Sequence, residues 1–106
     1  MQYNFEWDPG KAQNNIKKHG VTFEEAAEVF LDALHLTVFD NEHNEHEDRW
    51  STLGKNSKGN HVVVIHTFEE HGNQTATLRI ISARSATTNP PGVDLHAKRP
   101  KGDGQG

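Results

Sequence analysis

The chain has 106 residues, a net charge of −4 and a hydrophobic content of only 32%, so its length supports one domain with one modest core. It contains no cysteine, which excludes disulfides, a thiol nucleophile and thiolate metal ligands. Neither a membrane-spanning apolar stretch nor a basic-then-apolar leader is visible, and we therefore expect a cytoplasmic protein with no membrane partner.

The first predicted elements are a strand and two helices. Aromatic and polar side chains alternate over residues 3–7, which predicts a half-buried strand. Asp8, followed by a proline, is typical of a helix start, and Gly20, preceded by three basic residues, is typical of its end. Thr22 and Glu25 form the capping box of a second helix. The apolar face of that helix is predicted from five residues at helical spacing: Phe23, Ala26, Ala27, Phe30 and Leu31.

Four further strands are predicted after the helices, because alternating or β-branched runs are separated by turn-forming residues. An acidic, histidine-bearing loop at 40–48 and a turn at 69–74 interrupt them. Short connections predict an antiparallel meander with the helices on one face, which is an α+β fold of order β-α-α-β-β-β-β. The four strands are residues 34–39, 49–54, 62–65 and 75–83.

Charge and composition divide the chain unevenly. Residues 1–50 contain eleven acidic and four basic side chains, whereas residues 51–106 contain four acidic and seven basic ones. The excess of basic residues in the second half could form a local patch that binds nucleic acid despite the negative net charge. The alternative is that these charges only keep the surface solvated. Residues 89–106 are rich in proline, glycine and polar residues, which predicts a disordered tail after a domain spanning residues 1–88.

An ordered series of short motifs runs from residue 3 to residue 87. The motifs are Phe5-Glu6-Trp7-Asp8-Pro9, Lys11, Asn15, Lys18-His19-Gly20-Val21, Phe23-Glu24-Glu25-Ala26, Val29-Phe30-Leu31-Asp32, Glu47-Asp48-Arg49, Leu53-Gly54, Arg79-Ile80-Ile81-Ser82-Ala83-Arg84 and Ala86-Thr87. In this order and spacing they resemble the BrnT family, small bacterial ribonuclease toxins of type II toxin–antitoxin systems.

The resemblance implies a RelE-like fold and RNA cleavage that needs no metal or other cofactor. It also implies a BrnA-like ribbon-helix-helix antitoxin as partner, through which the toxin would contact DNA only indirectly. The family usually continues past its Ala-Thr pair into a charged C-terminal helix. Here Pro90-Pro91-Gly92 forbids such a helix.

Five residues are candidates for RNA cleavage, which needs a base, an acid and cations that stabilise the phosphate. Arg49, Arg79 and Arg84 are the predicted cations, because a guanidinium binds phosphate in a forked geometry. Glu47 is a candidate base, or the partner that orients Arg49. His66, in the central strand, is a candidate acid or base. The structural alternatives are ion pairs between the arginines and the acidic loop, and a hydrogen-bonded core position for the histidine.

Four lysines are predicted RNA contacts: Lys17, Lys18, Lys55 and Lys58. For the first two, stabilisation of a helix C-terminus is a sufficient explanation. A metal site built on His43 and His46 is a weaker hypothesis, because this pair lacks the helical register of a zinc-protease motif and a distant ligand of matching type. We therefore expect no bound metal.

The favoured interpretation is a ribonuclease toxin of a type II toxin–antitoxin system. The main alternative is a catalytically inactive binding module that keeps the antitoxin-binding surface but has lost activity with the C-terminal helix. A metal-binding protein centred on residues 40–48 is a third class.

Overall fold

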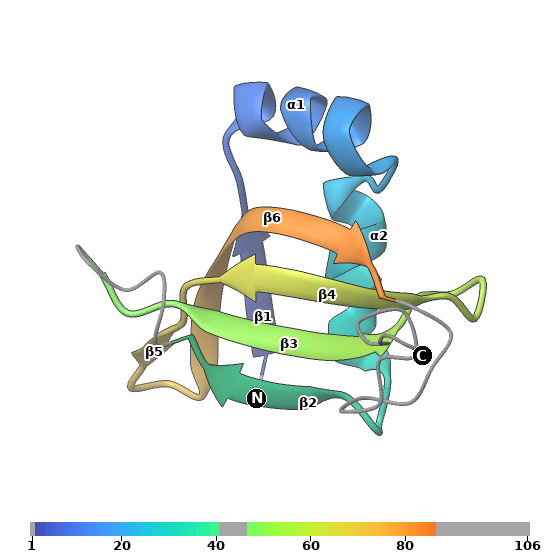
Figure 1. Ribbon diagram of the computed structural model, residues 1–106. Coiled ribbons are helices and arrows are strands. Elements are labelled where there is room, and N and C mark those ends of the chain that lie inside the picture. Colours follow the sequence, from blue (N-terminus) through green and yellow to red (C-terminus); the bar gives the residue numbers. More distant parts are fainter. Residues whose placement is uncertain (1, 41–46, 87–106) are drawn as a thin grey trace.

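The computed structural model describes residues 2–40 and 47–86, which form one sheet with helices packed against it (Figure 1). The predicted tail, the boundary at residue 88 and the paired histidines of the acidic loop lie outside the described residues. The elements run in the order β1 (Gln2–Glu6), α1 (Pro9–His19), α2 (Phe23–Glu28), a 3₁₀ turn (Val29–Leu31), β2 (Leu36–Phe39), β3 (Trp50–Lys55), β4 (His61–His66), β5 (Glu69–His71) and β6 (Thr75–Ser85).

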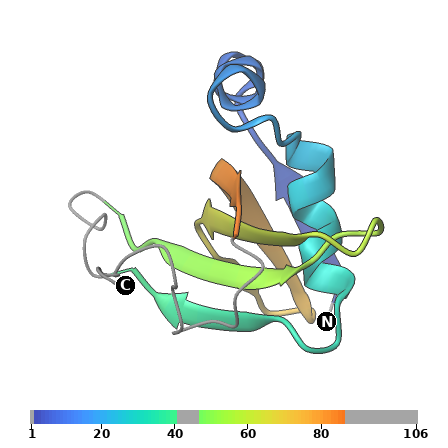
Figure 2. The same cartoon turned by 45° about the vertical axis from the view of Figure 1, so that its right-hand side comes forward.

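The sheet has the strand order β1-β6-β4-β3-β2, and the short β5 pairs with β6. β2, β3, β4 and β6 are antiparallel neighbours, as the predicted meander required. β1 lies parallel to β6. α2 lies across one side of the sheet, α1 lies along the edge at β6 (Figures 1 and 2), and no helix of the described chain covers the other side. The predicted α+β class is confirmed, and we call the uncovered side the open face.

The β5 strand corrects the predicted element order, which assigned residues 69–74 to a turn. Glu69–His71 pairs instead with the start of β6, so that the two strands form a hairpin. All three β5 residues are exposed and polar. A strand without an apolar face leaves no period-two signal in the sequence. The turn itself is confined to the next three residues, where Gln74 adopts a left-handed φ of 65°.

The joint between α1 and α2 forms as the sequence predicted. The Asp8 carboxylate accepts a hydrogen bond of 2.9 Å from the Lys11 backbone N–H and caps α1. Gly20 ends that helix with φ 71°, a conformation that costs glycine little. Thr22 and Glu25 exchange both hydrogen bonds of the capping box. Local capping chemistry therefore sets the course of the chain between the two helices.

The predicted apolar face of the second helix is correct as far as Phe30 and wrong at Leu31. The helix ends at Glu28, and the following 3₁₀ turn has about 3 residues per turn. The tighter turn buries Val29 completely and leaves Leu31 84% exposed. Gly54 allows this close packing, because a Cβ there would lie 2.8 Å from the Val29 Cγ1 atom.

The core lies between the helices and the covered face of the sheet. Along β4, Val62, Val64 and His66 are buried, whereas Val63 and Ile65 are half-buried on the open face. The buried hydrophobic residues are Val21, Phe23, Ala26, Val29, Phe30, Val62, Val64, Ala76, Leu78, Ile80 and Ala83. Within the two described segments, no helix is long and apolar enough to cross a membrane.

Candidate functional site

The open face carries a hollow with an arginine on either side of it. Its volume is about 360 Å³, and its lining comes from β3, β4, β6, the residue that follows β2 and the residue that precedes β3. We call it the arginine hollow. Its lining residues are Asp40, Arg49, Ser51, Val63, Ile65, Ile81, Ser82 and Arg84.

A bulge in β6 places Arg84 on this face. In a regular strand, residues five apart point to opposite faces, so Arg79 and Arg84 would be separated by the sheet. The pairing with β4 skips Ile81: Ile65 pairs with Ser82, whereas His66 pairs with Ile80. The extra residue reverses the alternation beyond it, so Ala83 enters the core and Arg84 joins the open face.

Asn15 of α1 holds the strand immediately beside Arg84. Its side chain is buried and makes three hydrogen bonds: Nδ2 donates to the carbonyls of Val21 and Ala83, at 2.9 and 2.8 Å, and Oδ1 accepts from the Ala83 N–H at 3.0 Å. Asn15 thus fixes the backbone one residue before Arg84. In the sequence, Asn15 is distinguished only as part of a family motif. The sequence signal that could have singled it out is an asparagine inside a predicted helix, where this residue type is unfavourable.

Glu47 joins two of the predicted cations. Its carboxylate accepts hydrogen bonds to both oxygens from the Arg79 Nη2 atom, and the Arg49 Nη2 atom lies 3.5 Å from Oε2. The hydrogen bond from Arg79 is the main reason that the pKa of Glu47 lies below its ordinary value of 4.5, and both positive charges add to the shift. The ion-pair alternative is therefore observed for both Arg79 and Arg49, and Glu47 is ionised at neutral pH.

Arg49 and Arg84 have donors that the described residues leave unsatisfied. The Arg49 Nε atom is buried and has no hydrogen-bond partner in the part of the chain that the structure describes. Arg84 is exposed and forms no ion pair with any residue of the 2–40 and 47–86 segments. Both guanidinium groups line the same hollow. An anion in this hollow could therefore accept hydrogen bonds from Arg84 without first breaking an ion pair of that residue with the described part of the chain.

His66 lies on the other face of the sheet and is 1% exposed. Its Nδ1 atom is 2.9 Å from the Thr67 carbonyl, which can only accept, so Nδ1 carries the proton. Nε2 must then accept the 2.7 Å hydrogen bond from the Thr52 hydroxyl. That oxygen in turn accepts a 2.7 Å hydrogen bond from Thr37. Burial lowers the pKa of His66 below its ordinary value of 6.5, so the ring is neutral.

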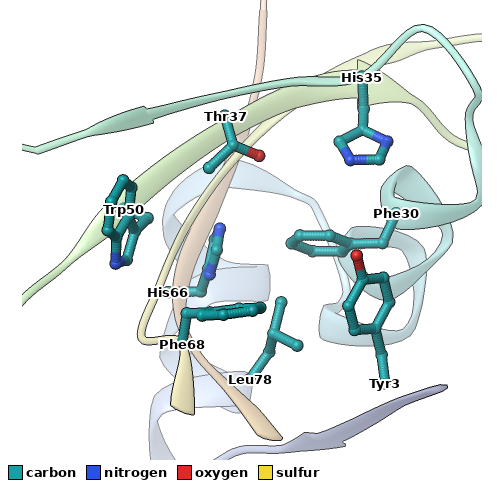
Figure 3. Close-up of a pocket in the computed structure, with 8 residues that line it drawn as sticks. All are labelled: Tyr3, Phe30, His35, Thr37, Trp50, His66, Phe68 and Leu78. Carbon is teal, nitrogen blue, oxygen red and sulfur yellow. The ribbon is translucent and has the colours of Figure 1, made fainter. Parts of the chain in front are cut away.

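This hydrogen-bonded histidine borders a second cavity, which we call the apolar pocket. The pocket has a volume of about 270 Å³, and four aromatic side chains surround it (Figure 3). It is lined by Tyr3, Phe30, His35, Thr37, Trp50, His66, Phe68 and Leu78. The sheet separates it from the arginine hollow, so the structure does not bring His66 together with the predicted cations.

The four predicted RNA-binding lysines do not form one cluster. Lys17 and Lys18 are exposed in the last turn of α1, where they suit the helix C-terminus. Lys55 ends β3, and Lys58 lies in the following turn with its Nζ atom 3.7 Å from the Glu25 Oε2 atom. Among the residues that the structure places, no group of three or more histidine, aspartate or glutamate side chains could hold a metal ion.

The fold and the hollow together define a class: a small α+β protein with a cationic surface on the uncovered face of its sheet. The family model described as "Ribonuclease toxin, BrnT, of type II toxin-antitoxin system" matches residues 7–89. The chain belongs to this family. Membership makes it a toxin-type ribonuclease with RNA as its general target and an antitoxin as partner.

A solved structure supports this assignment. The chain is similar to the crystal structure of the Brucella abortus ribonuclease toxin, BrnT, with 28% sequence identity and a TM-score of 0.54. The match covers 82% of this chain and 99% of that one. The comparison with curated proteins gives no match.

Proposed function

We propose that this chain is an endoribonuclease that binds its RNA substrate at the arginine hollow and cleaves it without a metal ion. The observation that supports this most strongly is that Arg49 and Arg84 line one hollow, with a buried Arg49 donor left unsatisfied by the described residues. Guanidinium groups on both sides of a phosphate would stabilise the charge that develops during cleavage.

The proposed reaction is an internal transfer at one phosphate. The 2′-oxygen forms a bond to phosphorus, the bond to the 5′-oxygen breaks, and a 2′,3′-cyclic phosphate results. A base takes the proton of the 2′-hydroxyl, and an acid returns a proton to the leaving oxygen. Glu47 is the proposed base, because its ionised carboxylate lies 3.5 Å from the Arg49 Nη2 atom and has a second arginine holding it in place.

Arg79 has a positioning role in this proposal. It donates to both oxygens of Glu47 and thereby fixes the carboxylate beside Arg49. His66 has no catalytic role here, because its two ring nitrogens are used within the covered face. The fold is proposed to be RelE-like, and the antitoxin to be a ribbon-helix-helix protein that occludes the open face in the cytoplasm and supplies all DNA contacts.

The test is cleavage of a labelled RNA oligonucleotide by the purified chain in the presence of EDTA. We expect cleavage to persist in EDTA and to give products with a cyclic phosphate end. Arg49→Ala and Arg84→Ala should each abolish most of it, whereas Lys11→Ala, which removes an exposed charge from α1, should not. Cleavage by the double arginine variant at the wild-type rate would refute the site. A folded wild-type chain that cleaves no RNA would favour the inactive binding module.

A further inference from the structure

The edge strand β2 and the apolar pocket together form a second surface, which adjoins the arginine hollow at Asp40. Among the residues that the structure describes, six large hydrophobic side chains are exposed. Four of them lie close together in sequence: Leu31, Leu34, Leu36 and Val38. A fifth, Phe68, lines the apolar pocket beside the strand. Such a concentration of exposed apolar surface is typical of an interaction site.

The backbone of β2 has unpaired groups along its outer side. β2 is the last strand of the sheet, so one side has no neighbouring strand within residues 2–40 and 47–86. Asp40 donates its N–H to the Arg49 carbonyl at 2.9 Å, which makes this a hydrogen-bonded pair. Pairs alternate along an antiparallel ladder, so the N–H and C=O groups of Thr37 and Phe39 point outward. The short contact between the Thr37 and Thr52 hydroxyls agrees with this assignment, because side chains lie closer together in a non-hydrogen-bonded pair.

This edge is short but lacks three other common protections against strand pairing. Natural edge strands carry lysine, proline or a bulge that prevents another strand from adding to them. Residues 33–39 contain no charged residue and no proline, and β2 pairs with β3 in unbroken register. As far as residues 2–40 and 47–86 show, the edge is open to a polypeptide in extended conformation.

The apolar pocket lies where a side chain of an added strand would point. The residue opposite Thr37 would project to the same face as Thr37, which lines the pocket (Figure 3). The pocket volume of about 270 Å³ suits one large side chain rather than a drug-sized ligand. Tyr3, Phe30, Trp50 and Phe68 would surround an aromatic or branched aliphatic group there. Side chains on the other face would cover Leu36 and Val38.

The charge around this edge selects the partner. Asp32 and Asp40 flank β2, and residues 31–40 contain no lysine or arginine. Hydrogen bonds from the backbone of Leu34 and Lys55 lower the pKa of Asp32, so it is ionised. A second copy of this chain would bring two acidic surfaces together. We propose that β2 and the apolar pocket bind an extended segment of another protein that is apolar at alternate positions and basic at its ends.

The test uses a synthetic peptide, Lys-Arg-Val-Thr-Phe-Thr-Val-Arg-Lys, labelled for fluorescence anisotropy with the full chain. We expect saturable binding. Methylation of alternate backbone nitrogens that face β2, or replacement of the central phenylalanine by alanine, should each weaken binding about tenfold or more. Val38→Lys should weaken it similarly, and the matched variant Ile16→Lys, on α1, should not. Circular dichroism would confirm that both variants fold.

Several results would overturn the proposal. They are absence of peptide binding, equal binding of the methylated and unmethylated peptides, and equal effects of Val38→Lys and Ile16→Lys. Sedimentation of the free chain as a dimer that Val38→Lys dissociates would identify a second copy as the occupant and would refute the basic partner segment. None of these readouts depends on RNA cleavage, so the proposal can fail while the ribonuclease assignment stands.

Discussion

The two faces of the sheet are built on different principles. The covered face is apolar, and its few polar side chains are fully hydrogen-bonded: Asn15 makes three bonds, and His66 uses both ring nitrogens. The open face carries three arginines and one glutamate in partly exposed positions, with an Arg49 donor that the described residues do not satisfy. Residues on the covered face therefore determine stability, whereas those on the open face are available for a ligand.

The sharpest test of this contrast is the double variant Arg49→Ala and Arg84→Ala. Loss of a single preorganised donor commonly lowers the rate about 10²- to 10³-fold, and we expect at least that loss of RNA cleavage here. The free energy of unfolding should change by less than about 1 kcal/mol, since exposed ion pairs contribute little. The measurements are cleavage rates and urea unfolding of the same preparations. If the double variant loses activity only because it unfolds, the two arginines stabilise the fold, and the open face does not differ from the covered face in the way described.

Asn15→Ala tests the covered face and its link to the site. The variant leaves the carbonyls of Val21 and Ala83 and the Ala83 N–H without their partner. Unsatisfied buried groups cost about 1–3 kcal/mol each, so we expect a destabilisation of about 3 kcal/mol or more. Below the unfolding transition, the folded fraction should still cleave RNA more slowly than wild type, because Ala83 no longer fixes Arg84. Full activity per folded molecule would show that Asn15 stabilises the fold without positioning the arginine.

Gly54→Ala tests how tightly the 3₁₀ turn packs on β3. The added Cβ would lie 2.8 Å from Val29 Cγ1 and 3.1 Å from the Val29 carbonyl oxygen, so the turn must shift. Overpacking of this kind costs about 1–3 kcal/mol, measurable by thermal or urea unfolding. Gly10→Ala, whose Cβ would approach only the Asp8 carboxylate, is the control. Equal stability of the two variants would contradict the packing described for Val29.

The smallest expected effect is a pH dependence of stability that arises from His66. Burial lowers its pKa below 6.5 in the folded chain, so the unfolded chain binds a proton at a higher pH than the folded chain does. Stability should therefore fall as the pH decreases from 7 through 6.5 towards the folded pKa. His66→Gln should reduce this slope in urea unfolding between pH 7 and pH 5. An unaltered slope in His66→Gln would contradict the burial effect.

Local and distant interactions explain what the sequence could predict. The caps at Asp8, Gly20, Thr22 and Glu25 depend on neighbours within a few residues, and all formed as predicted. The side of the sheet on which Arg84 lies depends on the bulge at Ile81, which is visible only in the pairing with β4. Strict alternation would have placed Arg79 and Arg84 on opposite faces.

The motifs and strand positions likewise identified candidate site residues, but they did not show which residues contact one another in the folded chain. Arg49 and Glu47 are two residues apart, and their ion pair was an available interpretation of the sequence. The pairing of Glu47 with Arg79 spans 32 residues and depends on the completed sheet. His66 occupies an alternating apolar strand, so the period of two placed it correctly in the sheet. Only the tertiary structure shows that it faces the helices.

The most direct test of the central claim is NMR mapping of RNA binding on the full chain. The probe is an RNA oligonucleotide with 2′-deoxy substitutions, which binds but cannot be cleaved through the 2′-oxygen. If RNA binds at the arginine hollow, the largest chemical-shift changes will occur at the side-chain N–H groups of Arg49 and Arg84 and at the backbone of Ser82. Chemical-shift changes concentrated around Phe30, His66 and Phe68, with the arginine signals unmoved, would show that RNA binds at the apolar pocket. They would contradict the assignment of the RNA-binding site to the arginine hollow.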